Sequence, residues 1–162
     1  MNLASYQKWA NHRILKAIHK MPSDNYFKDV KLPYGSVHAT INHLIAAHHL
    51  WRYRLAKIGT LPVSLVHIFH TNFDDTRNAI NILDDFWVNF LNKQAVVWYE
   101  THNTIEFQDG RLFTYANNQW LNHFWHHQSI IRGQLQTALE QQDIPCNQLD
   151  LIFYLMATDS KT

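Results

Sequence analysis

The sequence is poor in cysteine and glycine and has no excess of charge of one sign. Its 162 residues include one cysteine and four glycines, and 14 Lys and Arg stand against 13 Asp and Glu. One cysteine excludes an intramolecular disulfide and a cysteine-based zinc finger, and four scattered glycines exclude a glycine-rich phosphate-binding loop. Because nucleic-acid binders usually carry a basic excess that neutralises phosphates, we expect no nucleic-acid partner.

Long hydrophobic runs are missing as well. No stretch approaches the ~20 consecutive apolar residues that a membrane span needs. The start, MNLASYQKWANHR, has neither the apolar core nor the small-residue cleavage site of a signal peptide. We therefore expect a cytoplasmic protein with no membrane partner. Since 46% of the residues are apolar, a disordered tail is excluded, and the length fits a single domain over residues 1–162.

Helical periodicity dominates what is present. Apolar residues recur every three or four positions in four long segments, which predict helices over about 3–21, 36–57, 76–93 and 117–141. Four long helices without a parallel-strand pattern predict an all-α fold, a four-helix bundle. A short fifth helix, or an apolar tail laid over the bundle, is expected over 149–156.

The boundaries and connections carry their own signals. Ser36 is predicted to cap the second helix and Gly59 to end it, and Asp74 or Asp75 to cap the third. Asp109-Gly110 lies between apolar runs and predicts a β-hairpin before the fourth helix. Two further expectations concern the segments between helices: strand formers at 96–99, and an apolar loop at 61–69 that packs against the bundle.

Twelve histidines are the most unusual feature of the composition. His43 shares a helix face with small and apolar residues, so we expect it to point inward. His123 and His127 are four residues apart and therefore share a helix face. Such a pair can hold one metal ion, and a third imidazole from a facing helix completes a site with an open position for water or substrate. The pair lacks the Glu of the zinc-protease motif, so incidental histidines remain the alternative.

Other conspicuous residues favour structural roles. Cys146 follows a proline and has no activating neighbour, so we do not expect a catalytic thiol. The Asp84-Asp85 pair is interpreted as a solvated helix face rather than as a metal ligand or base. Several tryptophans fall at helical spacing, which predicts core or dimer-interface positions, and we expect a homodimer: Trp9, Trp51, Trp87 and Trp125.

Three segments resemble the DinB family of damage-inducible bacterial proteins. The start, Tyr6-Gln-Lys-Trp9-Ala10-Asn11, resembles the Y-x-x-W-A-N opening of that family. The segment from Gly35 through Asn42-His43-Leu44 to Trp51 and Arg54 resembles its second helix, with N-H-L-L and a later W-x-x-R. The segment HFWHHQSIIRGQ, residues 123–134, is similar to its H-x-x-N-H-Q-T-H-H-R-G-Q signature.

The resemblance implies a DinB/YfiT-like four-helix bundle, often dimeric, with a divalent metal, zinc or nickel, held by three histidines. Some relatives are transferases that use the metal to activate a small thiol. Two implied ligands fall on His43 and His127, but the third falls on Ile131. Three outcomes follow from this departure. The metal is lost, or the site has moved one turn to include His123, or another side chain such as His48 or a carboxylate completes it.

Our leading hypothesis is a metal-dependent enzyme that transfers a thiol to a small electrophile, with His43, His127 and His123 as candidate metal ligands. The alternative is a non-enzymatic bundle that has lost the metal and binds a small-molecule ligand or a partner. Ile130 and Ile131, which stand where the family signature has two histidines, favour this alternative.

Overall fold

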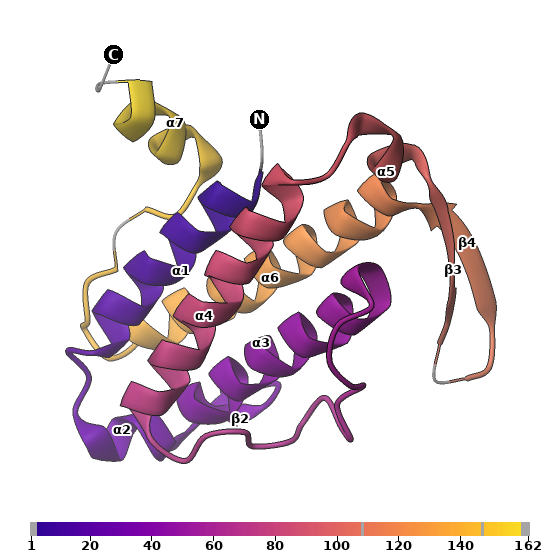
Figure 1. The fold of residues 1–162 in the computed structure, drawn as a ribbon. Helices are drawn as coiled ribbons and strands as arrows, with labels where there is room; N and C mark the ends of the chain where they lie inside the picture. The colour runs from indigo at the N-terminus through magenta and orange to yellow at the C-terminus, as the bar shows by residue number, and fades with distance from the viewer. Residues whose placement is uncertain (1–2, 108, 147, 160–162) are drawn as a thin grey trace.

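Four long helices form the body of the computed structural model, which describes residues 3–107, 109–146 and 148–159 (Figure 1). Helix α1 packs against α4 and α6, and α3 packs against the same two helices from the other side. The fold is thus mostly helical, as expected. The four long helices are α1 (Leu3–Ile18), α3 (Val37–Trp51), α4 (Phe73–Asn92) and α6 (Asn117–Glu140).

Short helices and strands pack against these four helices. Helix α7 (Leu151–Asp159) lies against α1, and α5 (Val96–Glu100) lies at the start of α6. Two antiparallel strand pairs are present in the described residues, and the second is the predicted hairpin around Gly110. The remaining elements are α2 (Ser23–Phe27), β1 (Asp29–Leu32), β2 (Gly35–Ser36), β3 (His102–Glu106) and β4 (Leu112–Ala116).

The helix boundaries confirm one predicted cap and correct two others. Ser36 caps α3, because its Oγ accepts a hydrogen bond from the Ala39 N–H at 3.0 Å. Helix α4 begins earlier than expected, because the Asn72 side chain, rather than Asp74 or Asp75, accepts the cap bond. After Trp51 the helix continues as a π-helical segment, η1 (Arg52–Ala56). This segment ends at Lys57, whose φ is 58°, and not at Gly59 as predicted.

Of the two expectations for the connections, the strand at 96–99 is wrong and the packed loop at 61–69 is confirmed. The strand formers at 96–99 lie in helix α5, where the Trp98 ring packs edge-on against Phe90 at 5.4 Å and the Tyr99 hydroxyl donates to the Leu91 carbonyl at 3.0 Å. These contacts with the end of α4 override the local β-propensity. The loop at 61–69 packs against the bundle as predicted, since Phe69 lies on the core and the N–H groups of Phe69 and His70 donate to Oδ1 of Asn42, although Val63 is 98% exposed.

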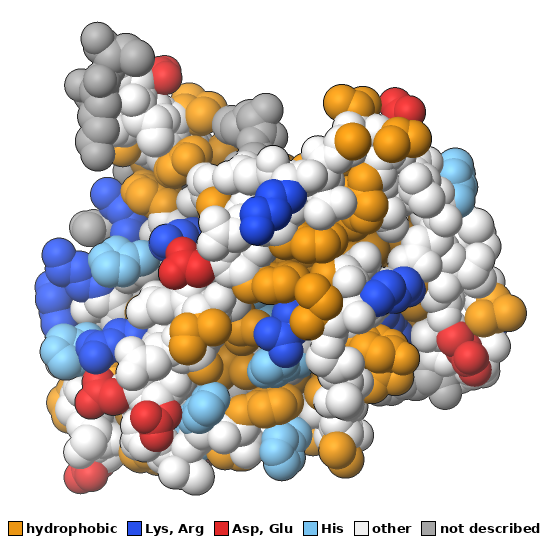
Figure 2. Space-filling model, in the orientation of Figure 1, with side chains coloured by type: hydrophobic (Ala, Val, Ile, Leu, Met, Phe, Trp, Pro, Cys, Tyr) orange, Lys and Arg blue, Asp and Glu red, His pale blue; other side chains and the backbone are white. Residues whose placement is uncertain are grey.

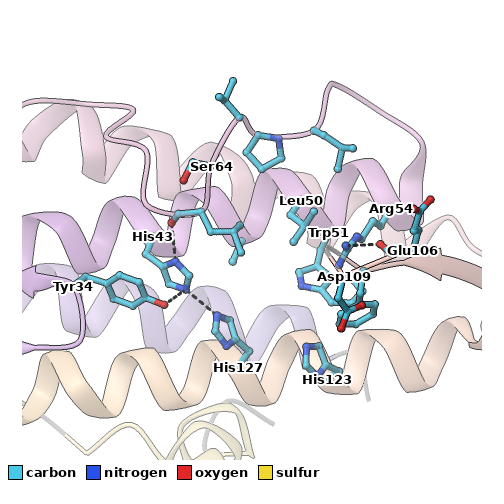
Figure 3. A pocket seen from close by; sticks show the side chains of 16 residues that line it. Tyr34, His43, Leu50, Trp51, Arg54, Ser64, Glu106, Asp109, His123 and His127 are labelled. Carbon is cyan, nitrogen blue, oxygen red and sulfur yellow. Dashed lines mark hydrogen bonds between the residues drawn. The ribbon is translucent and has the colours of Figure 1, made fainter. Parts of the chain in front are cut away.

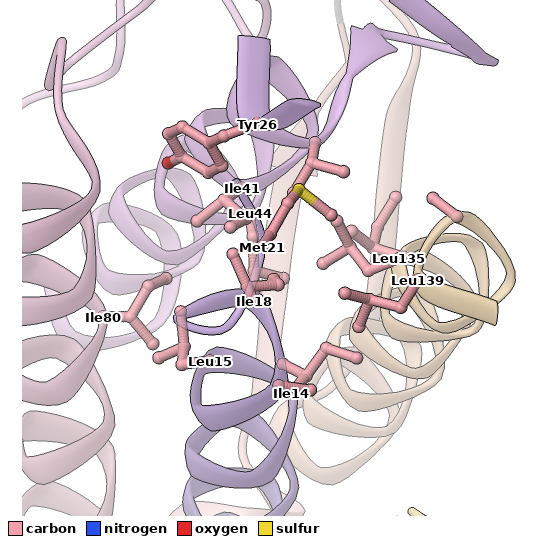
Figure 4. Close-up of a cluster of buried hydrophobic side chains, with 14 of the residues drawn as sticks. Ile14, Leu15, Ile18, Met21, Tyr26, Ile41, Leu44, Ile80, Leu135 and Leu139 are labelled. Atoms are coloured by element: carbon pink, nitrogen blue, oxygen red, sulfur yellow. The ribbon is translucent and has the colours of Figure 1, made fainter. Parts of the chain in front are cut away.

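Two apolar clusters fill the interior. The first, shown in Figure 4, joins α1, α3, α4 and α6 through aliphatic side chains such as Ile14, Ile41, Ile80 and Leu135. The second is aromatic, and its largest members confirm the core prediction for three tryptophans: Trp51, Trp87 and Trp125. The fourth, Trp9, lies edge-on to Tyr154 of α7.

A buried polar layer separates the two clusters, and it contains a carboxylate that we expected on the surface. Hydrogen bonds in this layer link polar side chains from all four long helices, among them Asn11, His48, Asp84 and Gln128. The Asp84 residue is only 3% exposed, whereas the side chain of its neighbour Asp85 is 54% exposed and pairs with Lys8. The solvated-face prediction therefore holds for Asp85 and is wrong for Asp84.

Charges on the outside are mixed. On the face in Figure 2, the described Lys and Arg side chains are interspersed with Asp, Glu and apolar side chains, in keeping with the small net charge of +1. Within the described ranges, no helix is long and apolar enough to cross a membrane.

Candidate functional site

An elongated pocket of about 770 Å³ lies between α3 and α6 (Figure 3). The loop around Pro62 and the β3–β4 hairpin form its rim. Most of its lining is apolar, and its polar groups gather at the two ends. Residues with polar side chains in the lining are Tyr34, His43, Arg54, Ser64, Glu106, Asp109, His123 and His127.

Two of the predicted metal ligands meet at one end of this pocket. His43 comes from α3 and His127 from α6, and their Nε2 atoms are 3.1 Å apart. The ring planes are inclined by 76°, so the two nitrogens approach each other while the rings do not stack. Helical phase alone predicted that His43 points inward, and the structure confirms it.

The tautomer of His43 follows from its hydrogen bonds. Its Nδ1 is 2.8 Å from the Leu65 carbonyl oxygen, which can only accept, so Nδ1 carries the proton and Nε2 carries a lone pair. The Tyr34 hydroxyl lies 2.8 Å from Nε2 and donates to it, and the two rings stack at 4.0 Å. Metal-ligating histidines typically donate a hydrogen bond from the N–H of their other ring nitrogen to a backbone carbonyl or a carboxylate.

Burial favours the neutral form of both imidazoles. It lowers the pKa of His43, an effect that the Leu65 carbonyl partly opposes. Burial also lowers the pKa of His127, and the neighbouring His43 and His123 add to this effect. Both side chains are therefore neutral near pH 7 and can offer lone pairs to a cation or to a proton.

His123 lies in the same pocket but away from this pair. Its ring is parallel to that of His127 at a centroid distance of 6.5 Å, and it packs against Trp51 at 5.3 Å. Among the described residues, no group of three or more His, Cys, Asp and Glu side chains is close enough together to hold a metal ion. The structure thus joins two of the three candidate ligands and leaves His123 one turn away (Figure 3).

The other candidates for a third ligand lie elsewhere. His48 is fully buried in the polar layer, where its Nε2 lies 2.9 Å from Nε2 of Gln128. Ile131 is 2% exposed and belongs to the aliphatic cluster, against which Tyr34 packs. The position that corresponds to the third family histidine is thus part of the core, whereas the Tyr34 hydroxyl contacts Nε2 of His43 directly.

Sequence reasoning missed Tyr34 and Leu65. Tyr34 lies in the turn between β1 and β2, and Leu65 in the irregular loop after η1, so neither belongs to a periodic pattern. Leu65 acts through its backbone carbonyl, which no side-chain motif can reveal.

Comparison with protein families identifies the chain. The family model of the DinB family matches residues 1–161. The chain belongs to the DinB family. A comparison with curated proteins gives no significant match. The match covers almost the whole of this DinB protein and not only the three short segments that resemble the family. It includes the parts of α3 and α6 that contribute His43 and His127.

Two imidazole nitrogens of this DinB protein are spaced as ligands of one divalent ion, but the third histidine of the family is absent. At metal–nitrogen distances of ~2.0–2.1 Å, two imidazole ligands of one tetrahedral ion stand ~3.3 Å apart. The Nε2 atoms of His43 and His127 lie 3.1 Å apart, and the His43 tautomer is the one a ligand needs. The third donor available at this end is the Tyr34 oxygen.

Proposed function

We propose that this protein is a four-helix-bundle enzyme of the thiol-transferase type, which uses a divalent metal and acts on a small electrophile. His43 and His127 would hold the ion, zinc or nickel, with the Tyr34 oxygen as a further donor. The observation that supports this most directly is the approach of His127 Nε2 to within 3.1 Å of His43 Nε2, which carries a lone pair, beside a pocket large enough for substrates.

The metal, when bound, would lower the pKa of a coordinated thiol and so make a thiolate available at neutral pH. The chain's own groups would do the rest. Leu65 fixes the orientation of His43 through its carbonyl, and the apolar rim around Pro62 limits the access of water. His123, whose pKa burial lowers, lies in the pocket as a neutral base that can accept the thiol proton. The sulfur then bonds to the electrophilic carbon, and the leaving group departs with its electron pair.

The alternative function is binding without catalysis. Ile131 favours it, because the third histidine of the family is replaced by a buried aliphatic side chain. Two imidazoles alone bind a divalent ion weakly, and the pocket remains suited to a small apolar ligand. A homodimer and a cytoplasmic location complete the proposal, and light scattering and fractionation test them.

Metal content separates the two functions. We expect protein purified without a histidine tag to contain close to one equivalent of zinc or nickel. His43→Gln and His127→Gln should each weaken metal binding at least ~100-fold, because each removes a ligand, and Tyr34→Phe about tenfold. Elemental analysis and competition with a chromophoric chelator measure these changes.

His126→Gln is the matched control for the metal measurement. His126 is exposed and its Nδ1 lies 2.7 Å from the Asn122 carbonyl of its own helix, so its replacement should leave the metal content unchanged. If the wild-type protein binds no metal after incubation with a panel of divalent ions, the metal-dependent function is excluded and the binding alternative holds. Turnover of 1-chloro-2,4-dinitrobenzene with cysteine, glutathione or coenzyme A then tests the transferase reaction itself.

A further inference from the structure

The far end of the pocket contains the guanidinium of Arg54, which forms no ion pair with an acidic side chain among the described residues. Arg54 extends from η1, and its guanidinium carbon lies 5.4 Å from the Trp51 ring centroid and 5.2 Å from that of Phe107. One guanidinium nitrogen donates to the Glu106 carbonyl at 3.0 Å. In the parts of the chain that the structure describes, no carboxylate forms an ion pair with Arg54. A guanidinium has five N–H donors, so several remain for a ligand.

The two acidic residues in the pocket lining, Glu106 and Asp109, form no ion pair with Arg54. Asp109 forms an ion pair with Arg111 at 2.7 Å, and the Glu106 residue is exposed. Burial lowers the pKa of Arg54, as expected for a cation whose surroundings are poor in compensating charge. Burial lowers the pKa of His123, and the positive charge of Arg54 lowers it further.

The two ends of the pocket lie along one helix face. His43 and Arg54 are eleven residues apart, about three helical turns, which corresponds to ~16 Å along the axis. Ala47, Leu50 and Trp51 line the pocket between them and present apolar surface. The cavity therefore resembles a slot with a pair of imidazoles at one end and a guanidinium between two aromatic rings at the other (Figure 3).

We propose that this slot binds an elongated small molecule with a carboxylate at one end, which Arg54 recognises. The apolar body of the ligand lies along Ala47, Leu50 and Trp51, and its other end reaches His43 and His127. Arginine suits this task because its planar fork matches a carboxylate and its faces stack on aromatic rings. Which group reacts at the histidine end depends on the proposed function, but recognition of the carboxylate does not.

Matched carboxylates and amides test the proposal. Isothermal titration with hexanoate, octanoate and dodecanoate, each compared with its primary amide, measures how much the negative charge of the ligand contributes to affinity. We expect the best carboxylate to bind the wild-type protein at least tenfold more tightly than its amide. Arg54→Gln should remove this preference by weakening the carboxylate alone, and Arg54→Lys should restore part of it. Arg77→Gln removes one positive charge from α4, outside the pocket lining, and should change neither affinity.

Three results would overturn the proposal: none of the carboxylates binds, acid and amide bind equally, or Arg54→Gln weakens both to the same extent. Circular dichroism and thermal unfolding of Arg54→Gln establish that the variant is folded. The same titrations on His43→Gln separate the two proposals. If the carboxylate preference persists there while metal content is lost, the subsite is independent of the metal. If metal binding is absent from the wild type but the preference is present, the proposed catalysis fails and the subsite stands.

Discussion

Arg132→Met should lower the free energy of unfolding by about 3–5 kcal/mol, the usual cost of removing one partner from a buried charge network. Arg132 is 2% exposed, and one of its guanidinium nitrogens donates to Oδ1 of Asn11 at 2.9 Å. The Asn11 amide in turn donates to both oxygens of Asp84, at 2.9 and 3.2 Å. Asn11 thus links the buried cation to the buried carboxylate, and methionine would leave that carboxylate uncompensated.

Urea unfolding near pH 8.5, above the pKa of about 7 of Asp84, measures this loss, because the carboxylate is then ionised. Arg77→Met is the control, because Arg77 is partly exposed and pairs with Asp74 on its own helix, and a change below about 1 kcal/mol is expected. The double variant Arg132→Met/Asp84→Asn should be more stable than Arg132→Met alone, since the uncompensated charge is then absent. A loss below 1 kcal/mol for Arg132→Met, or no recovery in the double variant, would show that the two charges are not coupled.

Asp84→Asn should change how stability depends on pH. Burial raises the pKa of Asp84 from 3.8 to about 7, although the bond from Asn11 and the charge of Arg132 oppose the rise. Between these two values the folded state holds the proton and the unfolded state does not. The stabilisation from this proton is therefore fully present below pH 3.8 and is lost as the pH rises through 7, by up to about 1.4 kcal/mol per unit.

His48 has the opposite linkage. Burial lowers its pKa from 6.5 to about 3, so its contribution is present above pH 6.5 and is lost as the pH falls toward 3. In the wild-type protein the two effects offset each other between about pH 4 and 6.5. Asparagine removes only the Asp84 effect. Hence the stability of Asp84→Asn relative to wild type should increase between pH 4.5 and 7.5, by about 2–4 kcal/mol in all.

Denaturant titrations at four pH values across this range test the expectation. Asp85→Asn is the matched control, because Asp85 is the next residue on α4 and is exposed beside Lys8. Its stability profile should run parallel to that of the wild type. If Asp84→Asn also runs parallel, Asp84 does not change its protonation in the folded protein over this range.

Much of the helical framework was predictable because its signals are local. Apolar periodicity located all four long helices, and Ser36 caps α3 because a serine side chain satisfies the first free N–H groups wherever the chain turns into a helix. The failures occurred where distant packing decides. Residues 96–99 have strand-forming side chains, but their contacts with the end of α4 hold them in α5.

The candidate site shows the same division. Helical phase oriented His43, and the resemblance to the DinB family paired it with His127, so these two residues were accessible from sequence. Tyr34 and the Leu65 carbonyl were not, because they reach His43 from irregular segments nine and twenty-two residues away. Asp84 was expected on a solvated face and His48 was named only as one candidate for the third metal ligand, yet both are buried in one polar layer.

The sequence by itself therefore determined the family, the four long helices and the two imidazoles that meet at one end of the pocket, since periodicity and motif spacing depend on near neighbours along the chain. The tertiary structure decided the tautomer of His43, the place of Ile131 in the core, the burial of Asp84 and the position of Arg54 between two aromatic rings. Each of these depends on which groups approach from other segments, because a hydrogen bond or a desolvation cost arises only when the chain has folded.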